Sequence, residues 1–347
     1  MSRQLDIVIP CHNVSNTIEL CLASLEREVA NAVKDKILHD VHLYIVDDGS
    51  TDNSISILSK RSYSIPHQII SQSQGGPSDA RNHGTKCGTA PWVLYLDSDV
   101  EIREGSLQRL FTALLQSPTL YAVNGYPTAM VPNGGWITHY TNASLCFQLY
   151  NHGDLVNTAF TSFCLMKRDA WDSMNGWDTS RRSRYSDDIQ SRWHFPPNSI
   201  QQCFEATFIH HKHVHIWGLL KHRFNLGYHY RDSLPTQQTV PNQKTQLFLH
   251  LRYPLNVLLA AFSIGFVPLT ILISSSILAI ILLSWFAVLM LTNGGLFNFI
   301  RRHSDLDHSM AHNLSIFGLS YLEGLSMGLG LFWSMILTVF SRTEHAS

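Results

Sequence analysis

The chain has 347 residues, of which 45% are hydrophobic and only 15% are charged, below the roughly 25% of charged residues in an average soluble domain. This low share of charge argues against a purely soluble protein. The 25 lysine and arginine residues balance 26 aspartate and glutamate residues, so neither nucleic acid nor another strongly charged partner is expected. The length allows about two domains.

Six cysteines are spread along the chain without a CxxC pair. This spacing favours reduced, buried thiols over a disulfide framework or a zinc site. The first residues carry Arg3 and Asp6 and lead directly into a strand-like segment, with no hydrophobic signal region. We therefore expect the polar part of the chain to face the cytoplasm.

Short apolar runs alternate with helix-like stretches through residues 1–116, which predicts an α/β domain with a parallel sheet. One of the helix-like stretches, residues 18–29, spaces its apolar side chains as a helix packed on that sheet would. Residues 117–232 have a weaker periodicity and are expected to complete the same domain. The predicted strands are residues 5–10, 41–46, 67–71 and 92–96.

Two of the predicted strands end on acidic residues. Asp47-Asp48-Gly49-Ser50 follows the second strand, and Asp97-Ser98-Asp99 follows the fourth. Open α/β sheets bind ligands beyond the carboxyl ends of their strands. A carboxylate pair there supplies the hard oxygen ligands that a divalent cation carrying a diphosphate needs. Each motif alone is also typical of a turn or a helix cap.

A long uncharged stretch indicates membrane segments. Residues 255–291 form a run of 37 uncharged residues, which as one straight helix would be nearly twice the ~30 Å hydrocarbon thickness. We therefore predict two transmembrane helices there and a third over residues 313–340. The amphipathic residues 296–312 are expected at the membrane surface. Residues 253–347 thus form the predicted membrane region, and residues 233–252 a linker or interfacial segment.

The positive charges near these helices predict the orientation of the chain. A hairpin would place Arg252 and the Arg301-Arg302 pair on one side of the membrane, and the positive-inside rule makes that side cytoplasmic. The alternative is a very apolar soluble helical domain, which would normally show a charged outer face. Glu323 lies inside the third predicted span, where a carboxylate needs a partner or a proton. A packing contact is favoured for it over a role with lipid headgroups.

Four motifs follow one another between residues 7 and 99, each at the end of a predicted strand or the start of a helix. They are Ile7-Val-Ile-Pro10-Cys-His-Asn13, Val46-Asp47-Asp48-Gly49-Ser50-Thr51-Asp52, Gly75-Gly76-Pro-Ser-Asp-Ala80-Arg81-Asn82-His-Gly84 and Tyr95-Leu96-Asp97-Ser98-Asp99. The series resembles the nucleotide-diphospho-sugar-binding half of family 2 glycosyltransferases. This resemblance implies a GT-A fold, a Rossmann-like mixed α/β sheet, followed here by the predicted transmembrane helices.

The resemblance also implies roles for residues of these motifs. The donor would be a nucleotide-diphospho-sugar, with a UDP-sugar favoured, and the cofactor Mn²⁺ or Mg²⁺. The family's pattern assigns Asp48 to the nucleotide base, Pro10 and Asn13 to the lining of its pocket, Arg81 to the base or diphosphate, Asp97 to the ribose and Asp99 to the metal.

The acceptor half of the family is matched further along the chain. Residues 166–171 look like its arginine-bearing strand, residues 175–178 like its acceptor loop, and Asp187-Asp188 like the pair that holds the general base. Matching that pair makes Asp188 the base. Two positions depart from the pattern, since Asn175 replaces a glycine and Asp187 replaces a glutamate, so Asp187 remains an alternative base. Capping of a helix N-terminus is compatible with either role.

A dense histidine cluster, His210-His211-Lys212-His213-Val214-His215, follows at the distance where the family carries a histidine near the metal. We choose His211 as the metal ligand, with His213 and His210 as alternatives. Alternate residues of a strand share a face, so an all-histidine zinc site is a further alternative, as is a plain surface run.

Two further segments bear on the acceptor. Residues 223–228 look like the family's basic helix before the membrane segments, and anchoring is favoured for them over binding of an acceptor phosphate. Processive members carry a Gln-x-x-Arg-Trp motif, whereas residues 190–193 here have one spacer too few. Transfer of a single sugar is therefore expected.

The leading hypothesis is a membrane-anchored inverting glycosyltransferase that moves one sugar to a hydroxyl acceptor, a lipid or lipid-linked saccharide, at the cytoplasmic membrane face. One base opposite the leaving group predicts inversion, and a metal would stabilise the departing diphosphate. The alternatives are a polyprenyl-phosphate sugar synthase, whose acceptor needs less help from a base, and a non-catalytic membrane scaffold that keeps the fold.

Overall fold

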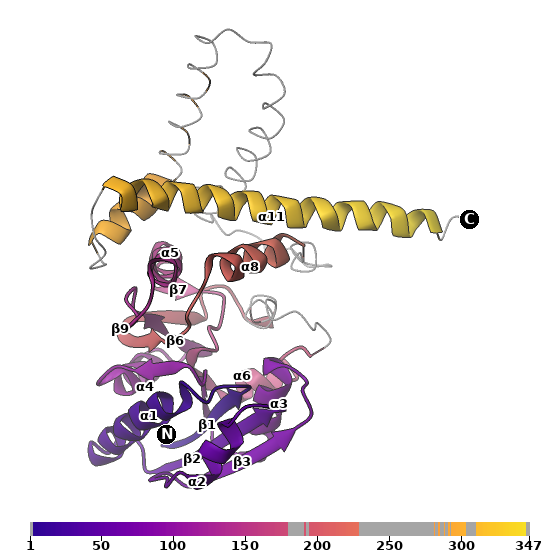
Figure 1. Cartoon of the computed structure of the whole chain (residues 1–347). Coiled ribbons are helices and arrows are strands. Elements are labelled where there is room, and N and C mark those ends of the chain that lie inside the picture. The colour runs from indigo at the N-terminus through magenta and orange to yellow at the C-terminus, as the bar shows by residue number, and fades with distance from the viewer. Residues whose placement is uncertain are drawn as a thin grey trace. The chain divides into compact units, whose positions relative to one another are not determined.

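The structure is a computed structural model that describes residues 3–179, 191, 194–228, 281, 284, 288, 291, 293–302 and 310–344 (Figure 1). The chain divides into two compact units. One, here called the sheet unit, comprises Met1–Pro132 and His152–Lys212. The other, here called the helical unit, comprises Asn133–Asn151 and His213–Ser347.

The first half of the sheet unit alternates strands and helices, and its strands pair in parallel in the order β3-β2-β1-β4. All four strands predicted from the sequence are confirmed. The elements are β1 (Gln4–Cys11), α1 (Ile18–Lys34), β2 (Asp40–Asp48), α2 (Ser54–Lys60), β3 (His67–Gln72), α3 (Pro77–Cys87) and β4 (Trp92–Leu96).

The second half continues the same sheet with mixed pairing, in the order β4-β8-β6-β9-β5. β8 runs antiparallel to β4, while β6 and β9 pair in parallel. The result is a nine-stranded sheet in the described residues. The elements are β5 (Val100–Ile102), α4 (Ser106–Gln116), β6 (Ala122–Pro127), β7 (Leu155–Val156), β8 (Phe163–Lys167), α6 (Arg168–Ser173) and β9 (Ile200–His210).

The core explains why the apolar runs become central strands. All five residues of β4 are buried, as expected for a strand covered on both faces. Along β1, Leu5, Ile7 and Ile9 join the cluster beneath α1 and α4, whereas Val8 faces the opposite side because side chains alternate along a strand. A Cβ added to Gly84 of α3 would lie 2.6 Å from Val8, so glycine allows α3 to pack close to that face.

Strand ends gather the polar motifs at one edge of the sheet unit. Asp48 ends β2, and Asp97 and Asp99 lie in the turn between β4 and β5. β5 pairs antiparallel with β9, which sets Val100 opposite His210. The backbone N–H of His211 donates to the carbonyl of Asp99 at 2.7 Å. Two segments more than a hundred residues apart in sequence therefore meet at this edge.

The helical unit contains α5 (Trp136–His152) up to Asn151, α8 (Ile216–Tyr228), a helix over residues 293–302, and α11 (Met310–Glu344). Backbones of α8 and α11 touch where a Cβ on Gly227 would lie 1.9 Å from the Met327 carbonyl. The predicted domain through residue 232 stays a prediction. α5 and α8 lie in the same unit as α11, and the three helices share a buried polar contact described below.

The predicted transmembrane helices fall largely outside the described residues. Of the run 255–291, only residues 281, 284, 288 and 291 are described. Where the chain is described, one helical segment, Ser315–Trp333 in α11, is long and apolar enough by length and composition to cross a membrane. It overlaps the third predicted span.

Candidate active site

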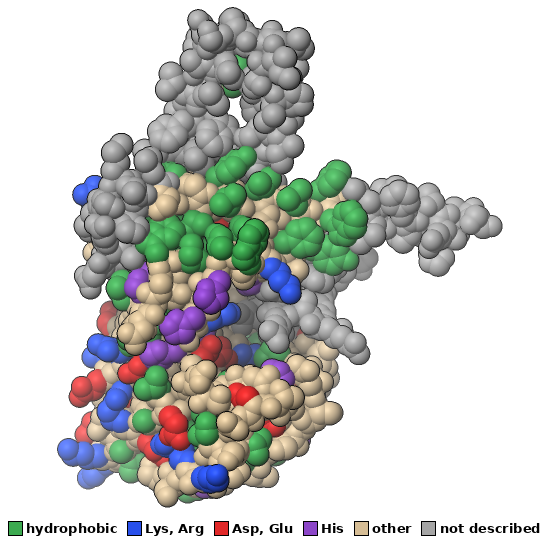
Figure 2. Space-filling model, in the orientation of Figure 1, with side chains coloured by type: hydrophobic (Ala, Val, Ile, Leu, Met, Phe, Trp, Pro, Cys, Tyr) green, Lys and Arg blue, Asp and Glu red, His purple; other side chains and the backbone are tan. Residues whose placement is uncertain are grey.

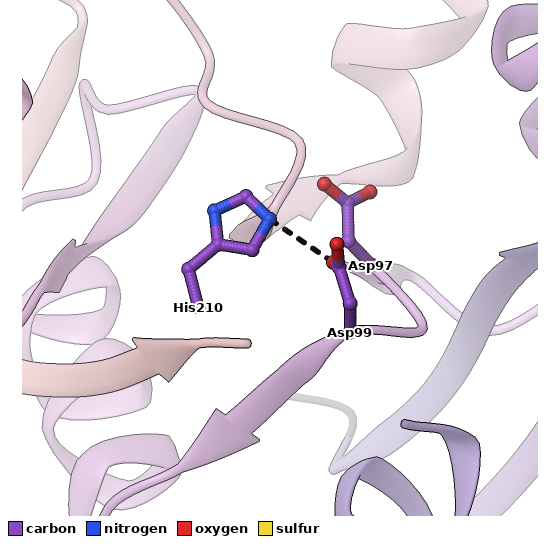
Figure 3. A group of neighbouring side chains, drawn as sticks. All are labelled: Asp97, Asp99 and His210. Atoms are coloured by element: carbon purple, nitrogen blue, oxygen red, sulfur yellow. Dashed lines mark ion pairs between the residues drawn. The ribbon is translucent and has the colours of Figure 1, made fainter. Parts of the chain in front are cut away.

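Two carboxylates and an imidazole form the centre of the site. The ligand atoms of Asp97, Asp99 and His210 all lie within 4.8 Å of one another. Figure 3 shows the His210 ring facing the Asp99 carboxylate, with His210 Nε2 3.0 Å from Asp99 Oδ1. All three side chains are partly exposed, so the cluster is open to a ligand.

The charges of this cluster reinforce one another. Burial opposes ionisation of Asp99, but the charge and hydrogen bond of His210, helped by Lys212, outweigh it and lower the pKa of Asp99. Burial likewise disfavours a charged His210, but the carboxylate of Asp99 raises the pKa of His210 above its usual value. The site therefore holds an ionised Asp99 in contact with a nitrogen ligand.

Asp97 is fixed by two side chains of the sheet unit. Arg81 Nη2 on α3 donates to Asp97 Oδ1 at 2.7 Å, and Ser162 Oγ donates to Asp97 Oδ2 at 2.7 Å. The Arg81 side chain is buried, with 6% exposure, so this ion pair is shielded from solvent. The sequence had placed Arg81 near the base or diphosphate and Asp97 near the ribose. The structure joins the two residues directly and sets Asp97 beside Asp99.

The structure brings His210, not His211, to the carboxylates. β9 ends at His210, and residues 211–215 belong to neither a strand nor a helix. The expected alternation of His211, His213 and His215 on one strand face is therefore not present. His211 Nε2 instead contacts Glu101 Oε2 at 2.7 Å. His210 was one of the two alternatives to His211. The pairing of β9 with β5 is what brings His210, rather than His211, next to Asp99.

Asp48 is buried at the end of β2 and fastens the loop that leads into α3. Its Oδ1 accepts from the backbone N–H of Gly75 at 2.7 Å, and its Oδ2 accepts from that of Gly76 at 2.8 Å. Gln72 Nε2 adds a third bond, to Oδ1, at 2.9 Å. Gly76 has φ +100, a conformation that favours glycine. Asp48, which the resemblance assigns to the nucleotide base, thus fixes the turn that leads into α3.

Asn13 joins two loops of the same edge. Its Oδ1 accepts from the backbone N–H of Thr51 at 2.8 Å, and its own N–H donates to Ser50 Oγ at 3.0 Å. The residue has φ 54, which asparagine tolerates better than most residues. Pro10 pairs with Val46 near the ends of β1 and β2. Both residues predicted to line the nucleotide pocket therefore lie at the expected edge.

Arg168 opens α6 directly after β8, where the resemblance placed an arginine-bearing strand. Its Nη2 donates to Asp6 Oδ2 at 2.6 Å, its Nε to the Ala90 carbonyl at 2.6 Å and its Nη1 to the Thr85 carbonyl at 2.9 Å. Asp6 is almost fully buried. Arg168 thus neutralises a buried charge and ties the start of α6 to β1 and to the end of α3.

Asn82 of α3 holds the loop that follows α6, which the resemblance predicts to be the acceptor loop. Its Nδ2 donates to the Trp177 carbonyl at 2.7 Å, and its Oδ1 accepts from the Trp177 N–H at 2.7 Å. The preceding Gly176 has φ +80, and a Cβ there would lie 2.8 Å from Asn82 Oδ1. Asn82 belongs to the third of the four motifs, and the sequence alone predicts no role for it. The predicted bases, Asp187 and Asp188, lie outside the described residues.

Residues 6–174 match the family described as Glycosyl transferase family 2. Among curated proteins, the chain is 29% identical over 116 residues to an uncharacterized glycosyltransferase, YibD, of Escherichia coli strain K12, covering 33% of this chain and 31% of the relative. It is 34% identical over 107 residues to an uncharacterized glycosyltransferase, EpsJ, of Bacillus subtilis strain 168, covering 30% and 28%. The matches thus span under a third of each of these relatives.

Among solved structures, the chain resembles a mannosyltransferase of Pyrobaculum calidifontis in complex with GDP-Man and Mn²⁺. The TM-score is 0.63 at 14% sequence identity, and the match covers 96% of this chain and 88% of the other. This likeness shows a shared fold.

Proposed function

We propose that this chain, which carries a glycosyltransferase family 2 domain over residues 6–174, moves one sugar from a nucleotide-diphospho-sugar to a hydroxyl acceptor with inversion. A UDP-sugar is the favoured donor. The acceptor is a lipid or lipid-linked saccharide at the cytoplasmic face of the membrane. The observation that carries the proposal is the cluster of Asp97, Asp99 and His210 at the edge that holds the donor-site motifs.

The donor set of the cluster fits a divalent cation. Two carboxylates offer hard oxygen ligands and the imidazole adds a nitrogen, a combination that suits Mn²⁺ and that Mg²⁺ also accepts through its oxygens. Asp99 and His210 would hold the ion, and Asp97 would add a further oxygen ligand. When bound, Mn²⁺ or Mg²⁺ would supply positive charge for the departing diphosphate. The mannosyltransferase with the similar fold was solved with Mn²⁺ and GDP-Man, which supports this choice.

Other residues of the chain would position the cluster, the nucleotide and the acceptor loop. Arg81 keeps Asp97 in place, so the cluster is organised before the donor arrives. Asp48 fixes the loop at Gly75 and Gly76, and this loop forms one wall for the nucleotide. Asn82 holds the acceptor loop at Trp177. All of these contacts belong to the sheet unit, which supports a donor site complete within it.

Removal of the proton from the acceptor hydroxyl falls to Asp188, with Asp187 as the alternative. Both residues follow the acceptor loop within ten positions of Asp178. A single base opposite the leaving group leads to inversion at the anomeric carbon, whereas retention by double displacement would need a separate nucleophile.

Membrane attachment supports the choice of a lipid acceptor. The charge-free residues 255–291 have the length of two spans, and an acceptor held in the same bilayer would meet the enzyme at the surface. The whole chain is accordingly proposed as an integral membrane protein whose sheet unit faces the cytoplasm.

A screen of nucleotide-sugars against the purified whole chain tests the proposal. UDP-sugars and GDP-sugars are incubated one at a time with Mn²⁺, and release of the nucleoside diphosphate is measured with and without a lipid extract. The proposal expects one donor class to be hydrolysed slowly and to be consumed faster when lipid is added, with a labelled lipid product. Absence of turnover with every donor, by a protein that melts cooperatively, would contradict it.

A further inference from the structure

The long helix α11 has two faces of different character. One face is packed inside the helical unit, where Ile316, Leu319, Ser320 and Glu323 are all buried. Glu323 is 1% exposed. A transmembrane helix in contact with lipid on all sides would not bury a carboxylate in this way.

The buried face is fastened by polar contacts from two other helices. Arg223 Nε of α8 donates to Glu323 Oε1 at 2.7 Å, and Tyr140 Oη of α5 donates to Glu323 Oε2 at 2.6 Å. Tyr140 Oη also lies 2.9 Å from Ser320 Oγ. The partner that Glu323 was predicted to need is therefore Arg223. A buried ion pair of this kind is held only when protein surrounds it and satisfies its hydrogen bonds.

The opposite face of α11 is apolar and exposed. Leu322, Leu329 and Trp333 follow one another at steps of seven and four residues, which places them in one line along a helix. They are 38%, 49% and 52% exposed, and the neighbouring Phe332 is 61% exposed. Figure 2 shows hydrophobic side chains gathered over this part of the helical unit. Between residues 315 and 333 the sole acidic or basic residue is Glu323, on the buried face.

The neighbouring α8 indicates that the middle of α11 is not inside a bilayer. Ser326 Oγ donates to the Leu220 carbonyl at 2.6 Å, so these two helices touch near the midpoint of the apolar segment. The next residue of α8, Lys221, is exposed. If α11 crossed the membrane, this lysine would lie in the hydrocarbon, where a charged side chain is strongly disfavoured.

The length of α11 is also compatible with a helix that lies in the plane of the membrane. It has 35 residues, so a straight helix extends about 52 Å, far more than the ~30 Å of the hydrocarbon core. A helix packed on protein along one face and apolar along its exposed face can lie in the plane of the interface, with the exposed face about 5 to 10 Å deep.

We infer that α11 lies along the membrane surface rather than across it, with the line of Leu322, Leu329 and Trp333 in contact with lipid. This inference rests on the proposed attachment of the chain to a membrane, and it replaces the third predicted span. The exposed Arg301 and Arg302 of the helix over residues 293–302 suit a bilayer that contains anionic headgroups.

Depth measurements with nitroxide labels test this arrangement. The whole chain is reconstituted into phosphatidylcholine vesicles that contain phosphatidylglycerol. Of the six cysteines only Cys87 is exposed, so Cys87→Ser gives a background in which Leu322→Cys and Trp333→Cys are labelled one at a time. Collision rates with oxygen and with a water-soluble nickel chelate give the depth of each label. Leu115→Cys on α4, a similarly exposed leucine of the sheet unit, is the matched control.

The inference expects the two α11 labels to have nearly the same depth, within about 5 Å, and the Leu115 label to be accessible to the nickel chelate. If the segment Ser315–Trp333 crossed the membrane, position 322 would lie about 3 Å from the bilayer centre and position 333 about 13 Å from it. The two depths would then differ by about 10 Å, and that result would overturn the inference. Labels shielded from both reagents in vesicle-bound protein would also overturn it, because another protein segment or a second copy would then cover the face. Failure of the chain to float with the vesicles would instead refute the proposed membrane attachment.

Discussion

The side-chain amide of Asn82 binds both backbone groups of Trp177, the N–H and the carbonyl, at 2.7 Å each. The residue before Asn82 is Arg81, which pairs with Asp97 of the cluster of two carboxylates and a histidine. One turn of α3 therefore contacts both this cluster and the loop at Trp177. We propose a positioning role for α3 on this basis.

Asn82→Ala should separate transfer from donor binding. Both hydrogen bonds to Trp177 are lost, and an error of about 1 Å in a positioned group can cost about 10² in rate. We expect kcat for transfer to fall by roughly 10- to 100-fold, while KM for the donor and its slow hydrolysis change little. Lys86→Ala on the same helix, where the side chain is exposed, is the control. An equal loss of hydrolysis and transfer would show that Asn82 only stabilises the fold.

His210→Gln and His211→Gln should differ in their need for metal. His210 lies 3.0 Å from Asp99, whereas His211 is paired with Glu101. We expect the Mn²⁺ concentration for half-maximal activity to rise at least tenfold in the His210 variant, in line with the effect of perturbing a metal site. The His211 variant should stay close to the wild type. A larger effect at His211 would restore the assignment made from sequence.

Glu323→Ala should destabilise the helical unit more than Glu323→Gln. Removing one partner of a buried ion pair leaves Arg223 without its counter-charge, which typically costs about 3 to 5 kcal/mol. Glutamine keeps the volume and can still accept from Tyr140. Replacing both residues in Arg223→Met with Glu323→Leu should recover part of the loss, because an apolar pair often substitutes for a buried ion pair. Thermal unfolding in detergent ranks the stabilities of these variants. A Glu323→Ala variant as stable as the wild type would contradict the prediction.

Asp188→Asn should lower the transfer rate by about 10² to 10⁴, the usual contribution of a general base, and leave donor binding nearly unchanged. Asp187→Asn should cost less. The opposite order would move the base to Asp187. If neither change matters, the acceptor is already ionised, and the polyprenyl-phosphate sugar synthase gains support.

Much of the sheet unit follows from local patterns in the sequence. The strands around Ile7, Val46 and Leu94 are short apolar runs between helical stretches, and such runs become buried parallel strands because both faces of the sheet are covered. The meeting of the acidic residues Asp48 and Asp99 at one edge was also predictable, because a parallel sheet brings the carboxyl ends of its strands together.

The parts that the sequence missed depend on contacts between distant segments. Selecting His210 over His211 requires knowing that β9 pairs with β5 and ends at that residue. Nor does local pattern show that α5 belongs with α11, because the contact from Tyr140 to Glu323 joins residues 183 positions apart. Hydropathy predicted that α11 could span a membrane, but it cannot show which face of the helix other helices bury.

If Asp97, Asp99 and His210 hold a metal on which sugar transfer depends, activity must follow the metal. Nucleoside diphosphate release from the donor is measured for the whole chain and its Asp99→Asn variant, with Mn²⁺ and then with a chelator. We predict that chelation abolishes the wild-type activity, that added Mn²⁺ restores it, and that the variant stays inactive while it melts normally. Full activity in the chelator, or an active Asp99→Asn variant, would contradict the account.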